Sequence, residues 1–439
     1  MSFKQISKVS FLSKVVLAAS VAMTLSTVSH AAVWETTRQW DDAAEQEFGI
    51  WIRNLKMDIF KNPSSPYHDI ATDCAHAAYT LRIIFASEHG LPIKLESTPD
   101  VDLSNDNPQF DSQPTQIAKV RRFIGLMKMH KNTDTLVDDT YPIAINRKTV
   151  HSGALFLNPA NPGKDVPLSY RAGHVYYIQD VYDNGMVKYM SSTVPEAVRD
   201  LEPRYGITFA PFGTDGGYRA WKRPNTTVQP GESLEQFKFA HWFPKAYLHR
   251  GSMGSLWVRW QAEIVNRLAR REMTVKEKMA YIIENVRAIV KERNFLVQSG
   301  WKLYQTKYHG NQCLSKADYD DYSTPTRDVK LQNELSDLRE VASIVAQSTF
   351  SWSGGGDVAS VFAQYKFEVM PGKTVDLNQL YDTFMTDKTL VISEPEHSPA
   401  VRWGLAAQGK WPCPNRAKEY FGHEHLNQQQ QPSNKEKPD

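Results

Sequence analysis

The hydrophobic positions of the chain follow two patterns, which change at about residue 231. Before that point, segments with helical spacing precede short runs that are typical of β-strands. In the segment 74–85, hydrophobic residues at 77, 78, 81, 84 and 85 share one face of a helix. Thr72 or Asp73 is suited to cap its N-terminus. The segment 33–60 also has helical spacing, so we expect at least two helices before the first strand.

Three runs later in this first part are typical of β-strands, and they cover residues 154–157, 175–181 and 186–190. The last two flank Asp183-Asn184-Gly185, a sequence that favours a tight turn between antiparallel strands. The sequence therefore predicts an α+β fold, in which a helix packs on a small antiparallel sheet.

Residues 93–150 separate the predicted helix from the predicted strands. They are polar and rich in turn-forming residues around one basic segment, residues 119–131. We interpret 93–150 as an insertion or a lid within a first domain of residues 32–230.

Long amphipathic segments follow residue 231, at 256–271, 275–295 and 329–348. Loops that contain Gly and Pro separate them. We therefore expect a mainly helical C-terminal domain over residues 231–425. The last residues, 426–439, combine glutamines with charged residues and prolines, a composition that predicts a disordered tail.

Residues 1–31 have the three parts of an export signal. Lysines occur within residues 1–14, a hydrophobic run covers residues 15–25, and Ser29-His30-Ala31 has the small-x-small pattern of a cleavage site. The hydrophobic run is far shorter than the roughly 20 residues that span a bilayer. The sequence predicts a cleaved signal peptide, a mature chain from Ala32 that lies in the periplasm or is secreted, and no membrane span after cleavage.

Composition and charge limit the classes of partner. The chain has 439 residues, of which 41% are hydrophobic and 23% charged, as expected for a globular protein long enough for two domains. Removal of Lys4, Lys8 and Lys14 with the signal peptide changes the formal net charge from +2 to −1. A chain without excess positive charge has no general attraction to nucleic acid, so we expect no nucleic-acid partner.

The chain has three cysteines, and cysteines of exported proteins tend to form disulfides. Cys313 and Cys413 lie in polar, turn-rich surroundings in the C-terminal half, whereas Cys74 is far upstream. We expect a Cys313–Cys413 disulfide that leaves Cys74 as a free thiol. The alternative is three unpaired, buried cysteines.

Cys74 and His174 are the strongest candidates for chemistry. A cysteine at a helix N-terminus gains thiolate character, because the unpaired backbone amides and the helix dipole favour negative charge there. Such a nucleophile needs an imidazole to accept and return protons. His174 begins a predicted strand, which is a rigid element, whereas His76 points to another side of the helix. The alternative for Cys74 is a small hydrophobic residue of the core.

The residues around these two candidates resemble a known family. Asp73-Cys74-Ala75 at the start of an amphipathic helix resembles the nucleophile motif of the NlpC-type and CHAP-type cell-wall amidases, which are papain-like cysteine hydrolases. Residues 152–156 resemble their first strand, and residues 173–178 with the turn that follows resemble their His-led strand and hairpin. The resemblance covers about residues 65–200. It implies a papain-like fold, with Cys74 as the nucleophile and His174 as general base and then general acid.

The resemblance also implies a third polar residue, which orients the imidazole from the returning strand. This position falls at about Ser191 in the present sequence. The family commonly has Glu, Asn, Asp or His there, and a hydroxyl orients an imidazole less strongly than a carboxylate does. The 100-residue interval between Cys74 and His174 is longer than usual, which agrees with an insertion at 93–150.

Three further residues are candidates for substrate binding. Tyr67 resembles a tyrosine that these enzymes keep upstream of the cysteine, near the oxyanion. Arg219 is suited to hold a substrate carboxylate, and Trp221 lies beside it in a segment that combines cations with aromatic residues. The alternative for this segment is an interdomain linker packed by Trp221. We find no metal-ligand spacing among the histidines and carboxylates, and we expect no metal and no cofactor.

The sequence therefore predicts an exported cysteine peptidase or amidase that cleaves an amide bond, in peptidoglycan stem peptides or in another peptide substrate. The helical domain would shape or block its cleft. Two alternatives remain open. The same Cys–His pair is able to transfer the acyl group to an amine, as an acyltransferase does, and the same fold is able to serve as a catalytically silent envelope-binding or scaffold protein.

Overall fold

The structure, a computed structural model, describes residues 32–158, 173–206, 214–240, 260–310, 314–322, 331, 334–339, 341–342, 358–370 and 372–385. The predicted signal peptide of residues 1–31, the cysteines Cys313 and Cys413, and the predicted disordered tail of residues 426–439 lie outside these ranges.

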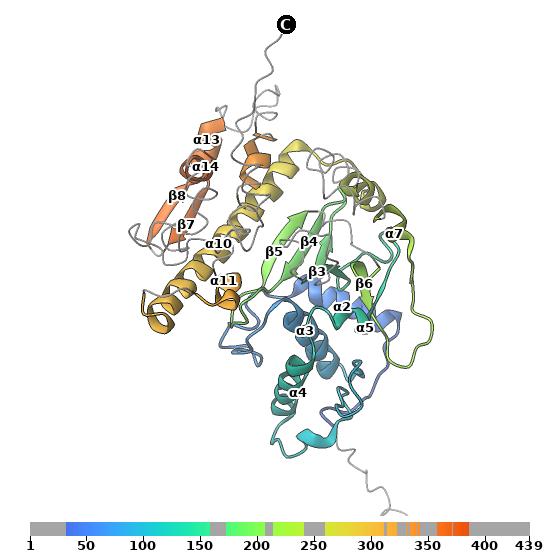
Figure 1. Ribbon diagram of the computed structural model, residues 1–439. Coiled ribbons are helices and arrows are strands. Elements are labelled where there is room, and N and C mark those ends of the chain that lie inside the picture. The colour runs from blue at the N-terminus through green and yellow to red at the C-terminus, as the bar shows by residue number, and fades with distance from the viewer. Residues whose placement is uncertain are drawn as a thin grey trace, which may run out of the picture.

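A six-stranded antiparallel sheet forms the centre of the fold (Figure 1). Its strands lie in the spatial order β1-β6-β2-β3-β4-β5, and each pair of neighbours is antiparallel. The strands are β1 (Thr140–Pro142), β2 (Leu155–Asn158), β3 (His174–Val181), β4 (Val187–Ser191), β5 (Glu202–Gly206) and β6 (Gly217–Trp221). The predicted strands are confirmed as β2, β3 and β4, and the class is mixed α/β with a small antiparallel sheet. Strands β1, β5 and β6 were not predicted.

The turn between β3 and β4 has the expected form. Gly185 has a φ of 79°, a conformation that favours glycine over residues with a side chain. The backbone N–H of Tyr182 donates to the carbonyl of Met186 at 2.9 Å, which closes the turn. The hairpin predicted from Asp183-Asn184-Gly185 is therefore confirmed.

Helix α3 (Cys74–Glu88) packs on one face of the sheet and is buried over most of its length. Its N-cap is Asp73, whose carboxylate accepts from the backbone N–H of His76 at 2.8 Å. The helix contacts alternate residues of the strands, because successive side chains of a strand point to opposite faces. These residues form one core with α2 (Asp42–Asn54); on the strands they are Leu155, Leu157, Val175, Tyr177 and Met190.

The segment 93–150, expected to be an insertion or lid, is an integral part of this core. It contains the short helix η1 (Pro108–Phe110), α4 (Gln116–His130), α5 (Leu136–Asp139) and strand β1. The basic segment of residues 119–131 lies largely in α4, whose buried residues Val120, Phe123, Ile124 and Met127 join the α3 core. The segment 93–150, which is predicted to be polar, therefore contains a helix with one apolar face, and that face is buried.

The other face of the sheet is covered from the C-terminal half of the chain. Residues 260–268 form a helix, and its residues Trp260, Ile264 and Leu268 are buried against Phe156, Ile178, Tyr189 and Tyr218 of the strands. The domain boundary expected at residue 230 therefore runs through a shared hydrophobic core.

Helix α10 (Val275–Lys307) runs along the edge of the sheet beside β5 (Figure 1). It has 33 residues and is about 50 Å long, and it begins with a capping box of Thr274 and Glu277. Its Asn285 side chain bonds both the backbone N–H and the carbonyl of Tyr205, each at 2.7 Å. An exposed strand edge is a site for unwanted pairing with another chain. Asn285 provides hydrogen-bond partners for two backbone groups of this edge.

The predicted helix 275–295 is thus confirmed and continues for a further 12 residues. Its other side contacts a third core, formed with Leu331, Leu335, Leu338, Val341 and Ala342 and with a hairpin and two helices that Figure 1 places beyond α10. They are α13 (Val358–Ala363), β7 (Lys366–Met370), β8 (Lys373–Asp376) and α14 (Leu377–Met385); the short α7 (Glu235–Ala240) and α11 (Lys316–Tyr322) complete the described helices that have labels. The β7–β8 hairpin was not expected in a mainly helical region.

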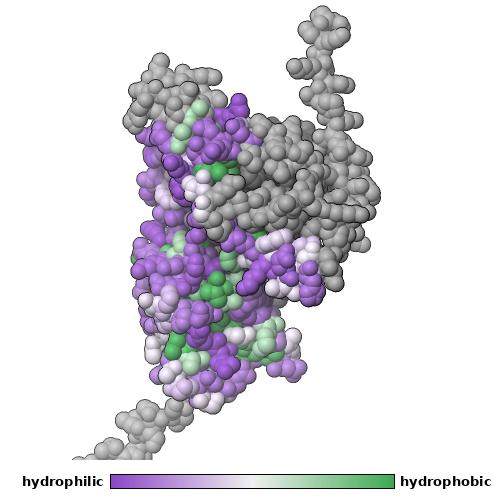
Figure 2. Space-filling model, turned by 90° about the vertical axis from the view of Figure 1, so that its left-hand side faces the viewer, coloured by the Kyte–Doolittle hydropathy of each residue, from purple (hydrophilic) through white to green (hydrophobic). Residues whose placement is uncertain are grey.

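On the face that Figure 2 shows, the surface of the described residues is largely polar. Figure 2 shows one face of the molecule, on which hydrophilic residues predominate and hydrophobic residues form small separate groups. In the part of the chain that the structure describes, no helix combines the length and the hydrophobicity needed to cross a membrane.

Candidate functional site

Cys74 is the first residue of α3, and its side chain lies against the first residues of β3. The thiol is free, and the residue is 5% exposed. The backbone N–H groups of Val175 and Ala75 are directed at the sulfur, and the Thr133 hydroxyl lies 3.7 Å from it. The helix N-terminus therefore brings Cys74 to the residue that directly follows His174.

His174 begins β3 and contacts the neighbouring strand β4. Its Nε2 atom lies 3.2 Å from the Ser191 hydroxyl oxygen. The pairing of Tyr177 with Met190 fixes this relation, because it places His174 and Ser191 on the same face of the sheet. The ring of Tyr176 packs edge-to-face on the imidazole, with 4.3 Å between the ring centroids. Ser191, the expected third residue, is therefore within hydrogen-bonding distance of the imidazole.

Burial raises the pKa of the Cys74 thiol to about 11, and the negative charge of Asp73 acts in the same direction. The Val175 and Ala75 amides and the Thr133 hydroxyl favour the thiolate but do not balance these effects. The sequence predicted thiolate character from the helix N-terminus alone. The structure corrects this prediction, because loss of water around the sulfur outweighs the helix dipole. Cys74 is a protonated thiol at neutral pH.

His76 has other partners. Its Nε2 atom donates to the backbone carbonyl of Lys131 at 3.0 Å, and its Nδ1 atom lies 3.0 Å from the Glu196 carboxylate. Both ring nitrogens are thus engaged away from the sulfur of Cys74. His174 is adjacent to Val175 in β3, but its side chain lies with Tyr176 and Ser191 on the face of the sheet opposite to α3, because Val175 and Tyr177 are the β3 residues that contact the helix.

Tyr67 lies at the other end of α3. Its hydroxyl donates to the Glu88 carboxylate at 2.9 Å, and Glu88 is the last residue of the helix. With a rise of 1.5 Å per residue, this is about 20 Å from Cys74. The structure therefore does not place Tyr67 beside the sulfur.

Arg219 and Trp221 lie in β6, an interior strand between β1 and β2, rather than in an interdomain linker. Arg219 is 3% exposed, and its guanidinium donates to the Thr140 hydroxyl at 2.7 Å and to the carbonyls of Thr140, Val137, Thr214 and Asp215. The indole of Trp221 donates to the Tyr177 hydroxyl at 3.0 Å. Both residues hold the sheet together, and the guanidinium has no remaining face for a substrate carboxylate.

Two groups at the thiol were not found by sequence reasoning. Thr133 lies in the segment that was interpreted as an insertion, 59 residues from Cys74. The sequence gives no indication of the Val175 backbone amide, since every residue except proline has a backbone N–H. Only the packing of α3 against β3 brings either group to the sulfur.

Comparison with known proteins gives no relative: no family model, no curated protein and no solved structure matches the chain. The fold is defined by the structure alone, as a mixed α/β arrangement around a small antiparallel sheet. A search of the described residues finds no group of three His, Cys, Asp or Glu side chains that would hold a metal ion. The chemical groups of the candidate site are therefore the Cys74 thiol, the His174 imidazole and the hydroxyls of Thr133 and Ser191.

Proposed function

We propose that this chain is an exported cysteine hydrolase with a papain-like arrangement, which cleaves an amide bond in peptidoglycan stem peptides or in another peptide. One observation carries the proposal. The thiol at the N-terminus of α3 contacts Val175, while the adjacent His174 contacts Ser191 at 3.2 Å. A nucleophile, a base and an orienting group in this order are the components of acyl transfer.

In the proposed reaction, His174 acts as a general base. It removes the proton of the Cys74 thiol as the sulfur attacks the carbonyl carbon, so that an S–C bond forms and the carbonyl oxygen becomes an oxyanion. The Cys74 backbone N–H, at the positive end of the α3 dipole, is suited to stabilise that charge. The imidazolium then protonates the leaving amine, the C–N bond breaks, and water hydrolyses the thioester with His174 again as base.

The raised pKa of Cys74 sets the form of this mechanism. A thiol that is protonated at neutral pH does not form a thiolate–imidazolium pair in the resting protein. Proton transfer then occurs during the attack, as in serine hydrolases, and the imidazole must be neutral beforehand.

A second candidate function rests on the burial of the same thiol. Cys74 is only 5% exposed, and a buried, protonated cysteine is typical of a core residue rather than a nucleophile. This favours a catalytically silent envelope-binding or scaffold protein on the same fold. The two candidates differ in whether the folded protein changes its ligand chemically.

Mass spectrometry of muropeptides incubated with the mature chain tests the proposal. We expect pairs of fragments whose masses add up to that of the precursor plus one water, and we expect Cys74→Ala and His174→Ala to remove them. His130→Ala is a matched control, because this histidine is exposed at the end of α4. Transfer of the acyl group to an added amine would indicate an acyltransferase. Unchanged muropeptides that co-sediment with the folded protein would support the scaffold candidate and contradict the hydrolase.

A further inference from the structure

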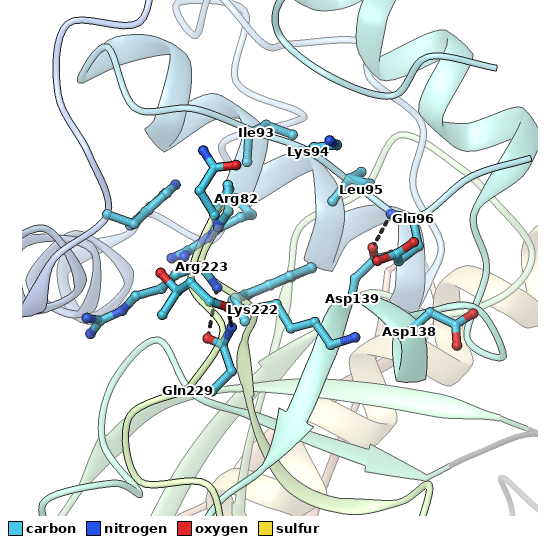
Figure 3. A pocket seen from close by; sticks show the side chains of 15 residues that line it. Arg82, Ile93, Lys94, Leu95, Glu96, Asp138, Asp139, Lys222, Arg223 and Gln229 are labelled. Atoms are coloured by element: carbon cyan, nitrogen blue, oxygen red, sulfur yellow. Dashed lines mark hydrogen bonds between the residues drawn. The ribbon is translucent and has the colours of Figure 1, made fainter. Parts of the chain in front are cut away.

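A second feature of the α3 region is a pocket of about 280 Å³ (Figure 3). It lies between α3, the segment 93–96, the end of α5 and the turn that follows β6. Arg82 is the α3 residue in its wall, eight residues after Cys74 and thus about 12 Å further along the helix. The pocket is therefore separate from the thiol site.

The inner wall of the pocket holds a guanidinium group whose charge is balanced by a carboxylate. Arg82 is 2% exposed and binds the two Glu45 carboxylate oxygens at 2.9 and 2.6 Å. Its guanidinium stacks on the Trp40 ring, 3.3 Å from the centroid. These contacts hold the guanidinium in one orientation.

A second guanidinium, that of Arg223, extends this wall toward solvent. It binds Asp42 at 2.7 Å, and its Nε atom lies 3.8 Å from Glu45. The Asp42 side chain is 90% exposed, so this outer ion pair is weak and open to exchange. A ligand carboxylate at this position would replace Asp42 and gain bidentate geometry from the guanidinium.

The opposite side of the pocket is acidic. The carboxylates of Glu96 and Asp138 have no hydrogen bond or ion pair within the described part of the chain, whereas the buried Asp139 binds Lys131, Tyr79 and the Glu96 amide. Figure 3 shows Glu96, Asp138 and Asp139 on one side and Arg223 on the other, with the Lys222 side chain extending between them. The pocket thus has at one end a guanidinium group in an exchangeable pair with Asp42, and at the other end two carboxylates, and its lining also includes Lys94 and Lys222.

We propose that this pocket binds a small zwitterion, an amino acid or a dipeptide with both termini free. Its carboxylate would bind Arg223 beside Arg82, and its ammonium would bind Asp138 and Glu96. The volume is near the lower end for ligand pockets, which fits a ligand of this size. The proposal goes beyond the hydrolase function and does not depend on Cys74.

Calorimetric titration of the mature chain with alanyl-alanine tests the inference. Alanyl-alanine with free termini is expected to bind, and N-acetylation or C-terminal amidation of the dipeptide is expected to weaken binding about tenfold each. Asp138→Asn should weaken binding of the free dipeptide but leave the affinity for the N-acetylated form unchanged. Arg223→Gln should likewise weaken binding of the free dipeptide, but it should leave the affinity for the C-terminal amide unchanged.

Two controls keep this test separate from the hydrolase proposal. Asp134→Asn changes an exposed carboxylate of the same chain segment outside the pocket and should bind like the unchanged chain. Cys74→Ala should also retain binding, even where hydrolysis is lost. Equal affinity for free and capped dipeptides would overturn the proposal, as would the absence of binding at millimolar concentration.

Discussion

Two buried ionisable groups on α3 differ in whether a group of opposite charge lies beside them. Cys74 and Arg82 are both at most 5% exposed on α3. Arg82 has the Glu45 carboxylate in bidentate contact and two aromatic rings beside it, whereas Cys74 has only backbone amides and a hydroxyl, with Asp73 nearby as a like charge. The comparison shows that partial charges at a helix N-terminus do not replace a counter-ion once water is excluded.

Removal of the Arg82 counter-ion should have the largest effect. Glu45→Ala leaves a buried guanidinium without its bidentate partner and should lower the free energy of unfolding by about 3–5 kcal/mol, as for other broken buried pairs. Chemical denaturation measures this change. Glu47→Ala, which breaks an exposed pair with Arg38, is the matched control and should have no measurable effect. Equal stability of the two variants would contradict the role given to Glu45.

The contrast between these two sites was only partly predictable. The start of α3 and the hairpin at 183–185 follow from local signals, namely a capping residue and a turn sequence, and the position of Ser191 follows from the family resemblance. The partners of the thiol and of Arg82 do not. Thr133 and Glu45 reach α3 from distant segments, and no sequence spacing records such contacts.

The same reason accounts for the other differences between sequence and structure. Strand β6 joins the sheet between β1 and β2 and buries Arg219 among carbonyls, although the sequence predicts a substrate-binding segment or an interdomain linker here. The helix at 260–268, which the sequence pattern assigns to a separate C-terminal domain, covers one face of the sheet. The sequence pattern shows that a face is apolar but does not show which element covers it.

The second prediction concerns alkaline pH. Because the folded state raises the pKa of Cys74 to about 11, it holds the thiol proton more tightly than the unfolded chain, whose thiol has a pKa of about 8.5. The stability that this contributes is present below pH 8.5 and is lost as the pH rises toward 11. Wild-type protein should therefore lose up to about 3 kcal/mol more than Cys74→Ala over this range. Denaturation of both proteins in parallel cancels the contribution of the tyrosines, and parallel curves would contradict the account.

The smallest expected effect concerns the orientation of His174. Ser191→Ala removes one hydrogen bond to the imidazole and should lower kcat for peptide hydrolysis about fivefold, which corresponds to roughly 1 kcal/mol, with little change in KM. Thr193→Ala, two residues further along the chain, is the matched control and should leave kcat unchanged. A loss as complete as that of His174→Ala would show that Ser191 does more than position the ring.

The central claim, that burial without a counter-ion keeps Cys74 neutral, is tested most directly by titration of the thiol itself. The measurement is the ultraviolet absorbance of the thiolate against pH, taken as the difference between wild-type protein and Cys74→Ala. The account predicts a midpoint near pH 11 that His174→Ala leaves in place. A midpoint below the ordinary thiol pKa of about 8.5, which His174→Ala moves upward, would contradict it and would show a preformed thiolate–imidazolium pair.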